Sequence, residues 1–303
     1  MKINFRNYSP EPFHTDDYRK VREFLMDINS GGLCEFRMPW GAWEWAVTHQ
    51  GRDQNNLGKI GLWESDSRVV ALATYETSLG EGFFVVDEAY AHLKPDMIAY
   101  AKEVLRDNEG KLRILLPDGD YEFARAARVQ GFRATEKSDY AAVLDIDGIN
   151  TNNKLPAGFS ITSMSEGWDW EQYNRVMRRS FRGDENPEWN EEIAAARRTM
   201  LSSPMIRPEI VLAVVDGEGK YVSHCGMWYK PGEFYAYVEP VATDPDYRKI
   251  GLGKAVVLEA VNRCAKLGAK QAVVGSNKQF YYNIGFYPVH RMTYWELAFP
   301  KGE

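Results

Sequence analysis

The sequence predicts an α/β fold that is built twice in tandem. Residues 149–158 (INTNNKLPAG) lack apolar periodicity and concentrate Asn, Pro and Gly near the middle of the chain, which predicts a linker. The segments on its two sides share three residue types at one offset of 154 positions: Gly131 with Gly285, Phe132 with Phe286, and Tyr140 with Tyr294. Three matches in register indicate two copies of one fold.

Each half shows the same order of expected elements. A helical stretch comes first, at residues 21–28 and 168–181, and short runs rich in Val, Tyr and Phe follow it as strands, at residues 68–75, 82–86, 209–215, 221–229 and 234–243. A helix, a strand (residues 112–116 and 271–274), a short helix and a closing strand complete each half. We therefore expect domains at 1–148 and 159–303, each a mixed sheet flanked by helices.

The composition excludes several classes of protein. The chain has 303 residues, of which 44% are hydrophobic and 26% charged, and this balance excludes a disordered or fibrous chain. Forty-three acidic residues against 37 basic ones give a net charge of −6, so we expect no nucleic-acid partner, since such proteins normally carry a basic excess. The chain has no long apolar run and no apolar stretch near its start, so we expect neither a membrane segment nor a signal peptide.

The three cysteines, Cys34, Cys225 and Cys264, show neither paired nor metal-ligand spacing. An odd number of widely separated cysteines favours a reduced, cytoplasmic chain without disulfides. We therefore expect no metal site. The sequence leaves an oligomer open.

The most informative segment runs from residue 238 to residue 268 and predicts a strand, a glycine-containing loop and an amphipathic helix. The helix ends where Gly268 supplies a C-terminal glycine, and its apolar face repeats at three- and four-residue spacing: Leu252, Val256, Ala260, Cys264 and Leu267. Gly251 and Gly253 therefore lie at the start of the helix, where unpaired N–H groups bind anions. Arg248 and Lys254 would add positive charge for a pyrophosphate.

Two common phosphate-binding motifs do not fit this loop. A P-loop requires Ser or Thr after Gly253-Lys254, where the chain has Ala255, and its first glycine would fall at Arg248. A dinucleotide fingerprint requires a third glycine, and that position is Val256.

The pattern Arg248-x-x-Gly251-x-Gly253 resembles the acyl-CoA loop of the GNAT superfamily of N-acetyltransferases. The preceding DPDYR (residues 244–248), the segment Glu239-Pro240-Val241-Ala242 and FYYNIGF (residues 280–286) are also similar to that family. These motifs cover nearly the whole second half, whereas the first half resembles the family only through the repeat. The resemblance implies two tandem GNAT-like domains, each with a mixed, mostly antiparallel sheet.

The resemblance also implies a cosubstrate, acetyl-CoA, and the residues that bind it. Val241 and Thr243 would present backbone groups to the pantetheine arm, with Ala242 near the thioester, and Asn277 would hydrogen-bond the arm. The pyrophosphate would be enclosed by a continuous loop: Arg248, Lys249, Ile250, Gly251, Leu252, Gly253 and Lys254.

Two further residues match catalytic positions of the family. Tyr281 matches the tyrosine that protonates the departing CoA thiolate, and Glu239 matches a position often used as general base, directly or through water. A carboxylate with a pKa raised by burial suits that role, because an ammonium must lose a proton before its nitrogen attacks a thioester. Pro240 cannot donate to a strand ladder, so we expect the sheet to be interrupted there and to open a cleft.

Structural roles compete with these assignments. Glu239 also fits a solvated strand residue, Tyr281 also fits a packing residue, and Tyr282 is a rival for the acid role. His224 and Cys225 are adjacent on an expected strand, so their side chains point to opposite faces and a Cys–His pair is not expected.

The first half departs from the pattern at the functional positions. Ala127 stands where the repeat places Tyr281, and the loop equivalent, HLKPDM (residues 92–97), has no glycine. We expect a degenerate copy. Four tryptophans are weak pocket candidates, for which packing is the favoured interpretation: Trp40, Trp43, Trp45 and Trp189.

The sequence thus predicts an acetyl-CoA-dependent N-acetyltransferase that acts on an amine, expected to be that of a small molecule, by direct transfer in a ternary complex. Two alternatives stay open at this point. One is a non-catalytic protein that binds or senses acyl-CoA, and the other is an acetyltransferase for a protein or peptide amine.

Overall fold

The computed structural model describes residues 2–11, 14–32, 38–147 and 155–297, which form two compact units. Unit 1 comprises residues 1–141 and 288–303, and unit 2 comprises residues 142–287. Cys34 and linker residues 149–154 lie outside the described residues. None of the helices in the described part is long and apolar enough to cross a membrane.

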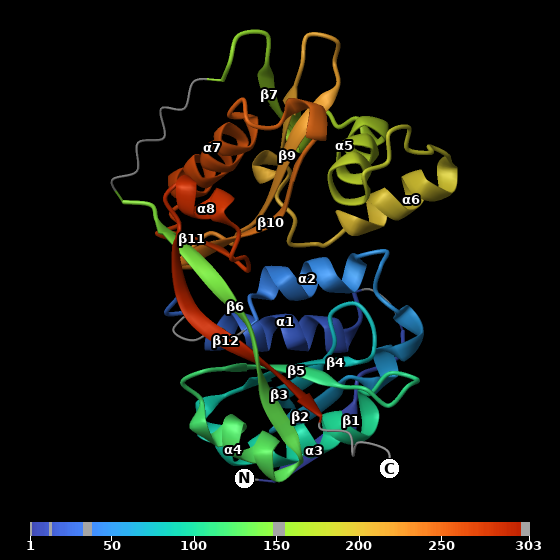
Figure 1. Ribbon diagram of the computed structural model, residues 1–303, viewed down its shortest axis with the longest axis vertical. Helices are drawn as coiled ribbons and strands as arrows, with labels where there is room; N and C mark the ends of the chain where they lie inside the picture. Colours follow the sequence, from blue (N-terminus) through green and yellow to red (C-terminus); the bar gives the residue numbers. More distant parts are fainter. Residues whose placement is uncertain (1, 12–13, 33–37, 148–154, 298–303) are drawn as a thin grey trace. The chain divides into compact units, whose positions relative to one another are not determined.

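Each half begins with a strand, β1 or β7, where the sequence predicts a helical stretch first; from that helix onward the predicted succession of strands and helices is present. The elements of unit 1 are (Figure 1): β1 (Ile3–Asn7), α1 (Asp16–Ile28), α2 (Trp40–Thr48), η1 (Gln54–Lys59), β2 (Gly61–Ser65), β3 (Arg68–Thr74), β4 (Glu81–Val86), η2 (Glu88–Leu93), α3 (Lys94–Val104), β5 (Arg113–Pro117), α4 (Tyr121–Val129) and the first part of β6 (Phe132–Asp145). Strand β4 runs parallel to β5, and the other described pairs of this unit are antiparallel.

Unit 2 repeats the same order (Figure 1): β7 (Ser160–Ser163), η3 (Met164–Glu166), α5 (Trp170–Arg182), α6 (Glu191–Met200), η4 (Pro208–Ile210), β8 (Leu212–Val215), β9 (Tyr221–Trp228), β10 (Tyr235–Thr243), η5 (Pro245–Tyr247), α7 (Leu252–Lys266), β11 (Gln271–Val274), α8 (Gln279–Asn283) and the start of β12 (Tyr287–Leu297). Strands β10 and β11 are parallel, and the other described pairs are antiparallel. The predicted mixed, mostly antiparallel α/β architecture is confirmed in both units.

The closing strands are exchanged between the two halves of the sequence. In unit 1, β12 from the C-terminal half pairs with β5, with Met292 opposite Pro117. In unit 2, the last residues of β6 from the N-terminal half pair with β11, with Ala142 opposite Val274. The compact units therefore divide the chain within β6 and β12, whereas the predicted boundaries place the division at the linker.

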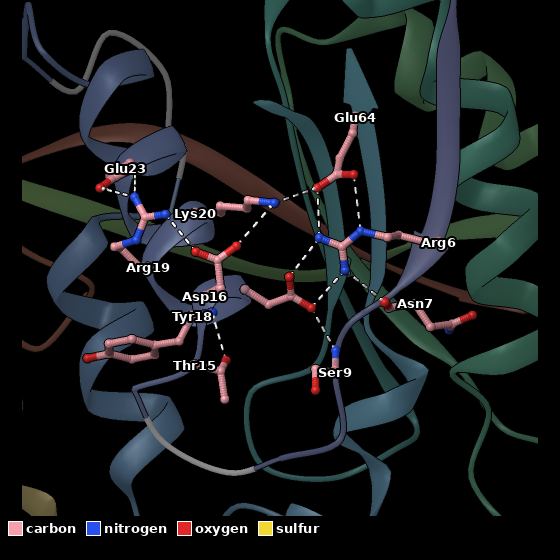
Figure 2. A network of polar contacts seen from close by, with 11 residues as sticks. Arg6, Asn7, Ser9, Thr15, Asp16, Tyr18, Arg19, Lys20, Glu23 and Glu64 are labelled. Carbon is pink, nitrogen blue, oxygen red and sulfur yellow. Dashed lines mark hydrogen bonds and ion pairs between the residues drawn. The ribbon is translucent and has the colours of Figure 1, made fainter. Parts of the chain in front are cut away.

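A network of ion pairs fixes α1 against the strands in unit 1. Figure 2 shows Arg6 of β1 reaching Glu64 of β2, and its Nη2 lies 2.7 Å from that carboxylate and 2.6 Å from Asp17 of α1. These partners raise the pKa of Arg6, so the guanidinium stays charged.

Trp40 and Trp43 of α2 are fully buried in unit 1, which confirms their packing role, and Trp45 is partly buried.

The core of unit 2 lies between the sheet and α7. Alternate residues of the central strands, such as Cys225 on β9 and Val238 on β10, share this core with Val256 and Ala260 of α7. Gly268 follows the helix at a φ of +111°, as the capping pattern predicts. Helix α5 packs on β9 and β10, and Figure 1 shows it across these strands from α7.

One expected strand begins later than predicted. The run at residues 209–215 is a strand only from Leu212, because Pro208–Ile210 form a 3₁₀ turn. The proline at the start of that turn has no N–H for a ladder.

Candidate active site

Strand β10 is interrupted in the middle of unit 2. It pairs with β11 only over residues 235–237, and its register with β9 shifts between Val238 and Val241. Pro240 lies within this bulge, so the interruption predicted from the proline is confirmed. Gly226 of β9 makes the bulge sterically feasible, since a Cβ there would lie 2.6 Å from the carbonyl oxygen of Glu239.

A pocket of about 650 Å³ opens beside the end of β10. All the predicted binding residues except Ile250 and Asn277 line it. Ile250 is 49% exposed, and Asn277 is exposed on the loop after β11. The lining also includes residues that were not predicted: Ser180, Phe181, Tyr247, Lys278, Phe280, Asn283 and Ile284. Phe280, Asn283 and Ile284 belong to the same motif as Tyr281, which is the signal that could have indicated them.

The loop between η5 and α7 brings backbone donors to this pocket. Gly251 is the N-cap of α7 with a φ of +94°, and no side chain caps the helix. The amides of the first turn of α7 therefore have no acceptor within the helix and can bind an anion. Lys249 and Lys254, which also line the pocket, add positive charge.

Arg248 holds the loop in place. Its Nε donates to the carbonyl of Thr243 at 3.1 Å, and its Nη2 donates to the carbonyl of Ser180 at 3.2 Å. The side chain therefore links the end of β10 to the end of α5. Two of its nitrogens are thus used in positioning the loop.

Tyr281 lies at the inner side of the pocket, on α8. Its side chain is buried between Phe280 and Phe286, with ring centroids at 5.0 and 5.5 Å. Burial raises the pKa of Tyr281 well above its ordinary value, and the neighbouring Cys225 and Glu239 raise it further. The phenol therefore stays protonated and is suited to donate a proton.

Glu239 occupies the bulge of β10 and is partly exposed. Its Oε2 accepts a hydrogen bond from the hydroxyl of Tyr237 at 3.3 Å, and its backbone carbonyl accepts one from Nε1 of Trp228 at 3.0 Å. Its carboxylate lies within electrostatic reach of Tyr281, whose pKa it raises. Tyr281 lines the pocket and Glu239 is not among its lining residues, so their joint role as catalytic pair stays a prediction.

The buried carboxylate of Asp244 connects the start of the loop to α5. Asp244 is fully buried and accepts hydrogen bonds from Arg175 Nη2 at 2.9 Å and from Arg179 Nε at 2.7 Å, both on α5. Its other oxygen accepts from the amide of Asp246 at 3.1 Å. Although DPDYR was part of the motif, no sequence pattern indicated that α5 would supply these partners.

His224 and Cys225 point to opposite faces of β9, as predicted. Cys225 lies in the core with α7, whereas the ring of His224 contacts Trp168 and Tyr173. Neither ring nitrogen of His224 has a hydrogen-bond partner within the part of the chain that the structure describes. Burial lowers the pKa of His224 to about 3, so the ring is neutral in the folded protein at neutral pH.

This depressed pKa predicts a loss of stability in mild acid. Below pH 6.5 the unfolded chain binds a proton at His224 that the folded chain does not, so the free energy of unfolding falls by up to about 1.4 kcal/mol per pH unit down to about pH 3. Urea unfolding at pH 7 and at pH 5 measures this fall in the free energy of unfolding. The variant His224→Phe should show a smaller loss over this range than the wild type, and an equal loss would contradict the assignment.

The corresponding place in unit 1 is occupied by an internal ion pair. The repeat offset places Lys94 at the position of Arg248. The Lys94 side chain is 5% exposed, and its ammonium lies 3.0 Å from Asp120 and 3.2 Å from Glu122. The counterpart of Arg248 is thus paired with two carboxylates of the chain, and Ala127, the counterpart of Tyr281, is buried.

Comparison with known families identifies the enzyme class. Residues 170–288, which contain the pocket, match the model of the acetyltransferase (GNAT) family. The C-terminal half belongs to the GNAT family of acetyltransferases. Membership implies an acyl-CoA cosubstrate for this GNAT unit. No curated protein matches the sequence.

Solved structures show that the tandem fold extends over the whole chain. A tandem GNAT protein from the clavulanic acid biosynthesis pathway aligns with a TM-score of 0.61 at 14% identity, covering 99% of this chain and 100% of its own. A GCN5-related N-acetyltransferase from Sphaerobacter thermophilus aligns with a TM-score of 0.60 at 14% identity, covering 97% and 95%. At these identities the likeness concerns the fold, and it supports two GNAT-like copies.

The described residues contain no cluster of His, Cys, Asp and Glu that could hold a metal ion.

Trp189, the remaining tryptophan candidate, lies in the segment that joins α5 to α6. It is partly buried and is not among the residues that line the pocket.

Proposed function

We propose that the protein transfers the acetyl group of acetyl-CoA to an amine of a small molecule, by direct attack in a ternary complex. The observation that carries this proposal is the pocket at the β10 bulge, which has helix-terminal amides at one end and Tyr281 deeper inside. Such a pocket suits a ligand with an anionic pyrophosphate and an extended arm.

The bulge supplies the backbone groups for that arm. Beyond Tyr237, β10 no longer pairs with β11, and Val241 and Thr243 line the pocket, so we expect the main chain of Val241 and the amide of Thr243 to bind the pantetheine amides; the carbonyl of Thr243 already accepts from Arg248. Ala242 then lies beside the thioester. The pyrophosphate binds at the first turn of α7, near Lys249 and Lys254.

The chemistry removes two protons from the ammonium nitrogen and adds one to the CoA sulfur. Glu239 takes a proton from the substrate ammonium, directly or through water, and the neutral nitrogen attacks the thioester carbon. The C–N bond forms, the C–S bond breaks, and the CoA thiolate takes the phenolic proton of Tyr281. The nitrogen loses its second proton as the amide forms, and this proton restores the phenol. The buried phenol is protonated at neutral pH, which suits this role.

Calorimetric titration with acetyl-CoA tests the proposal first. We expect one site per chain, because the loop equivalent in unit 1, residues 92–97, has no glycine, and its Lys94 is already paired with Asp120 and Glu122. An affinity in the micromolar range corresponds to about −8 kcal/mol. No binding would exclude the acetyltransferase function, and two sites would show that unit 1 is competent.

The variant Tyr281→Phe tests the acid. We expect kcat to fall about 100-fold or more with the affinity for acetyl-CoA unchanged, because only proton donation to the thiolate is lost. The wild-type rate should hold up to pH 10, since burial raises the pKa of Tyr281 above that value. Tyr282→Phe is the matched control, because Tyr282 does not line the pocket. If that control loses activity while Tyr281→Phe keeps it, the acid is Tyr282.

A further inference from the structure

Arg197 of α6 is a buried cation without a carboxylate partner among the residues that the structure describes. The residue is 7% exposed, its Nε donates to Oδ1 of Asn174 at 2.9 Å, and its Nη1 lies 3.3 Å from the sulfur of Met200. Neither partner neutralises the charge, and burial lowers the pKa of Arg197. Because an unpaired buried charge is strongly destabilising, an anion is the partner that this position lacks.

The phenol of Tyr173 relates this cation to Glu239. The guanidinium of Arg197 lies 5.8 Å from the ring centroid of Tyr173, which is fully buried on α5. The Tyr173 hydroxyl has no hydrogen-bond partner in the described part of the chain. Burial raises the pKa of Tyr173, which Arg197 lowers and Glu239 raises, so both charges act on one side chain.

These groups lie on the face of the sheet opposite α7. Side chains alternate along β10, so Glu239 and Tyr237 face away from the core that Val238 shares with α7. On this side of unit 2, α5 packs on β9 and β10 and α6 packs on α5; these helices carry Tyr173 and Arg197. Glu239, whose carboxylate can bind an ammonium, and Arg197, whose guanidinium can bind a carboxylate, thus lie on the same side of the sheet.

We infer that the acceptor is an amino acid or a similar amino-carboxylate, whose carboxylate binds Arg197 and whose amine is held at Glu239. This inference rests on the proposed acetyltransferase function. A guanidinium binds a carboxylate through two parallel hydrogen bonds, and the hydroxyl of Tyr173 adds a third donor. An amine without a carboxylate leaves Arg197 buried and unpaired, so such an amine is discriminated against.

Matched acceptors test the inference directly. Acetyl transfer is measured with the twenty amino acids and with amines that lack the carboxylate, in the pairs phenylalanine and phenethylamine, lysine and cadaverine, and arginine and agmatine. We expect at least one amino acid to exceed its paired amine about 100-fold in kcat/KM. In Arg197→Gln that preference should disappear through a higher KM for the amino acid, while the KM for the amine falls because no buried charge is left unpaired, and Arg197→Lys should restore part of the preference.

A neighbouring arginine provides the control. Arg198 lies on the exposed side of α6, where it pairs with Glu191 at 2.8 Å, so Arg198→Gln should leave the preference intact. If Arg197 serves only to hold Asn174, whose amide donates to the carbonyl of Glu188, then Arg197→Gln lowers kcat/KM for both acceptors equally, and the inference fails.

The remaining outcomes separate the two proposals. Bound acetyl-CoA with equal transfer to amines and amino acids, or with transfer to no amino acid, overturns the inference and leaves the acetyl-CoA site standing. Failure to bind acetyl-CoA overturns the proposed function itself.

Discussion

Asp244→Ala is expected to lower the free energy of unfolding by about 3–5 kcal/mol. Asp244 is fully buried and neutralises two guanidiniums, those of Arg175 and Arg179, which the variant leaves without their shared carboxylate. The variant also removes the acceptor for the amide of Asp246. Removing one partner of a buried ion pair is costly, because the remaining charges stay desolvated.

The same variant should weaken acetyl-CoA binding. Asp244 precedes the loop that Arg248 fixes to the Ser180 carbonyl, so loosening α5 from β10 loosens the loop amides as well. Urea unfolding measures the stability, and calorimetry at a temperature where the variant is folded measures the affinity.

Asp246→Ala is the control for this prediction. Asp246 also pairs with Arg179, but its side chain is 71% exposed, and exposed pairs contribute at most about 1 kcal/mol. Comparable losses for the two variants would show that burial at Asp244 is not the deciding factor. In Asp244→Asn, the amide oxygen still accepts from the backbone, so we expect an intermediate loss.

The fold was accessible from sequence because its signals are local. Residues 271–274 form a strand within the predicted bounds, and Gly268 ends α7 as its position indicates, since apolar periodicity and glycine conformation act over a few residues. The exchange of β6 and β12 could not be predicted from the sequence. Both strands have the same pattern in either sheet, so nothing local distinguishes pairing with β5 from pairing with β11.

The candidate site was also only partly predictable from the sequence. The loop at residues 248–254 was predicted because Gly251 and Gly253 carry their conformational role in their residue type. The contribution of α5 could not be predicted, since Arg179 and Asp244 are 65 residues apart and only the packed structure brings them together. The buried charge of Arg197 is likewise a property of packing, because the sequence of α6 alone suits an exposed arginine.

Gly226 did carry a local signal, since a glycine inside a strand marks a bulge or a close backbone approach. An alanine Cβ at this position would lie 2.6 Å from the carbonyl oxygen of Glu239 and 3.0 Å from Cδ of Pro240. The first of these is a backbone atom, so the clash cannot be relieved by rotating a side chain. Strand β9 or the bulge of β10 must move.

Gly226→Ala is therefore expected to lower the free energy of unfolding by about 3 kcal/mol and to reduce acetyl transfer more than it reduces acetyl-CoA affinity. The displaced Glu239 carbonyl is also the acceptor for Trp228, so the carboxylate of Glu239 moves with the bulge while the loop at α7 stays in place. Urea unfolding, kcat and calorimetry separate these effects. Gly217→Ala is the matched control, because a Cβ there meets nothing within 4 Å. If Gly226→Ala keeps full activity, the position of the bulge does not determine catalysis.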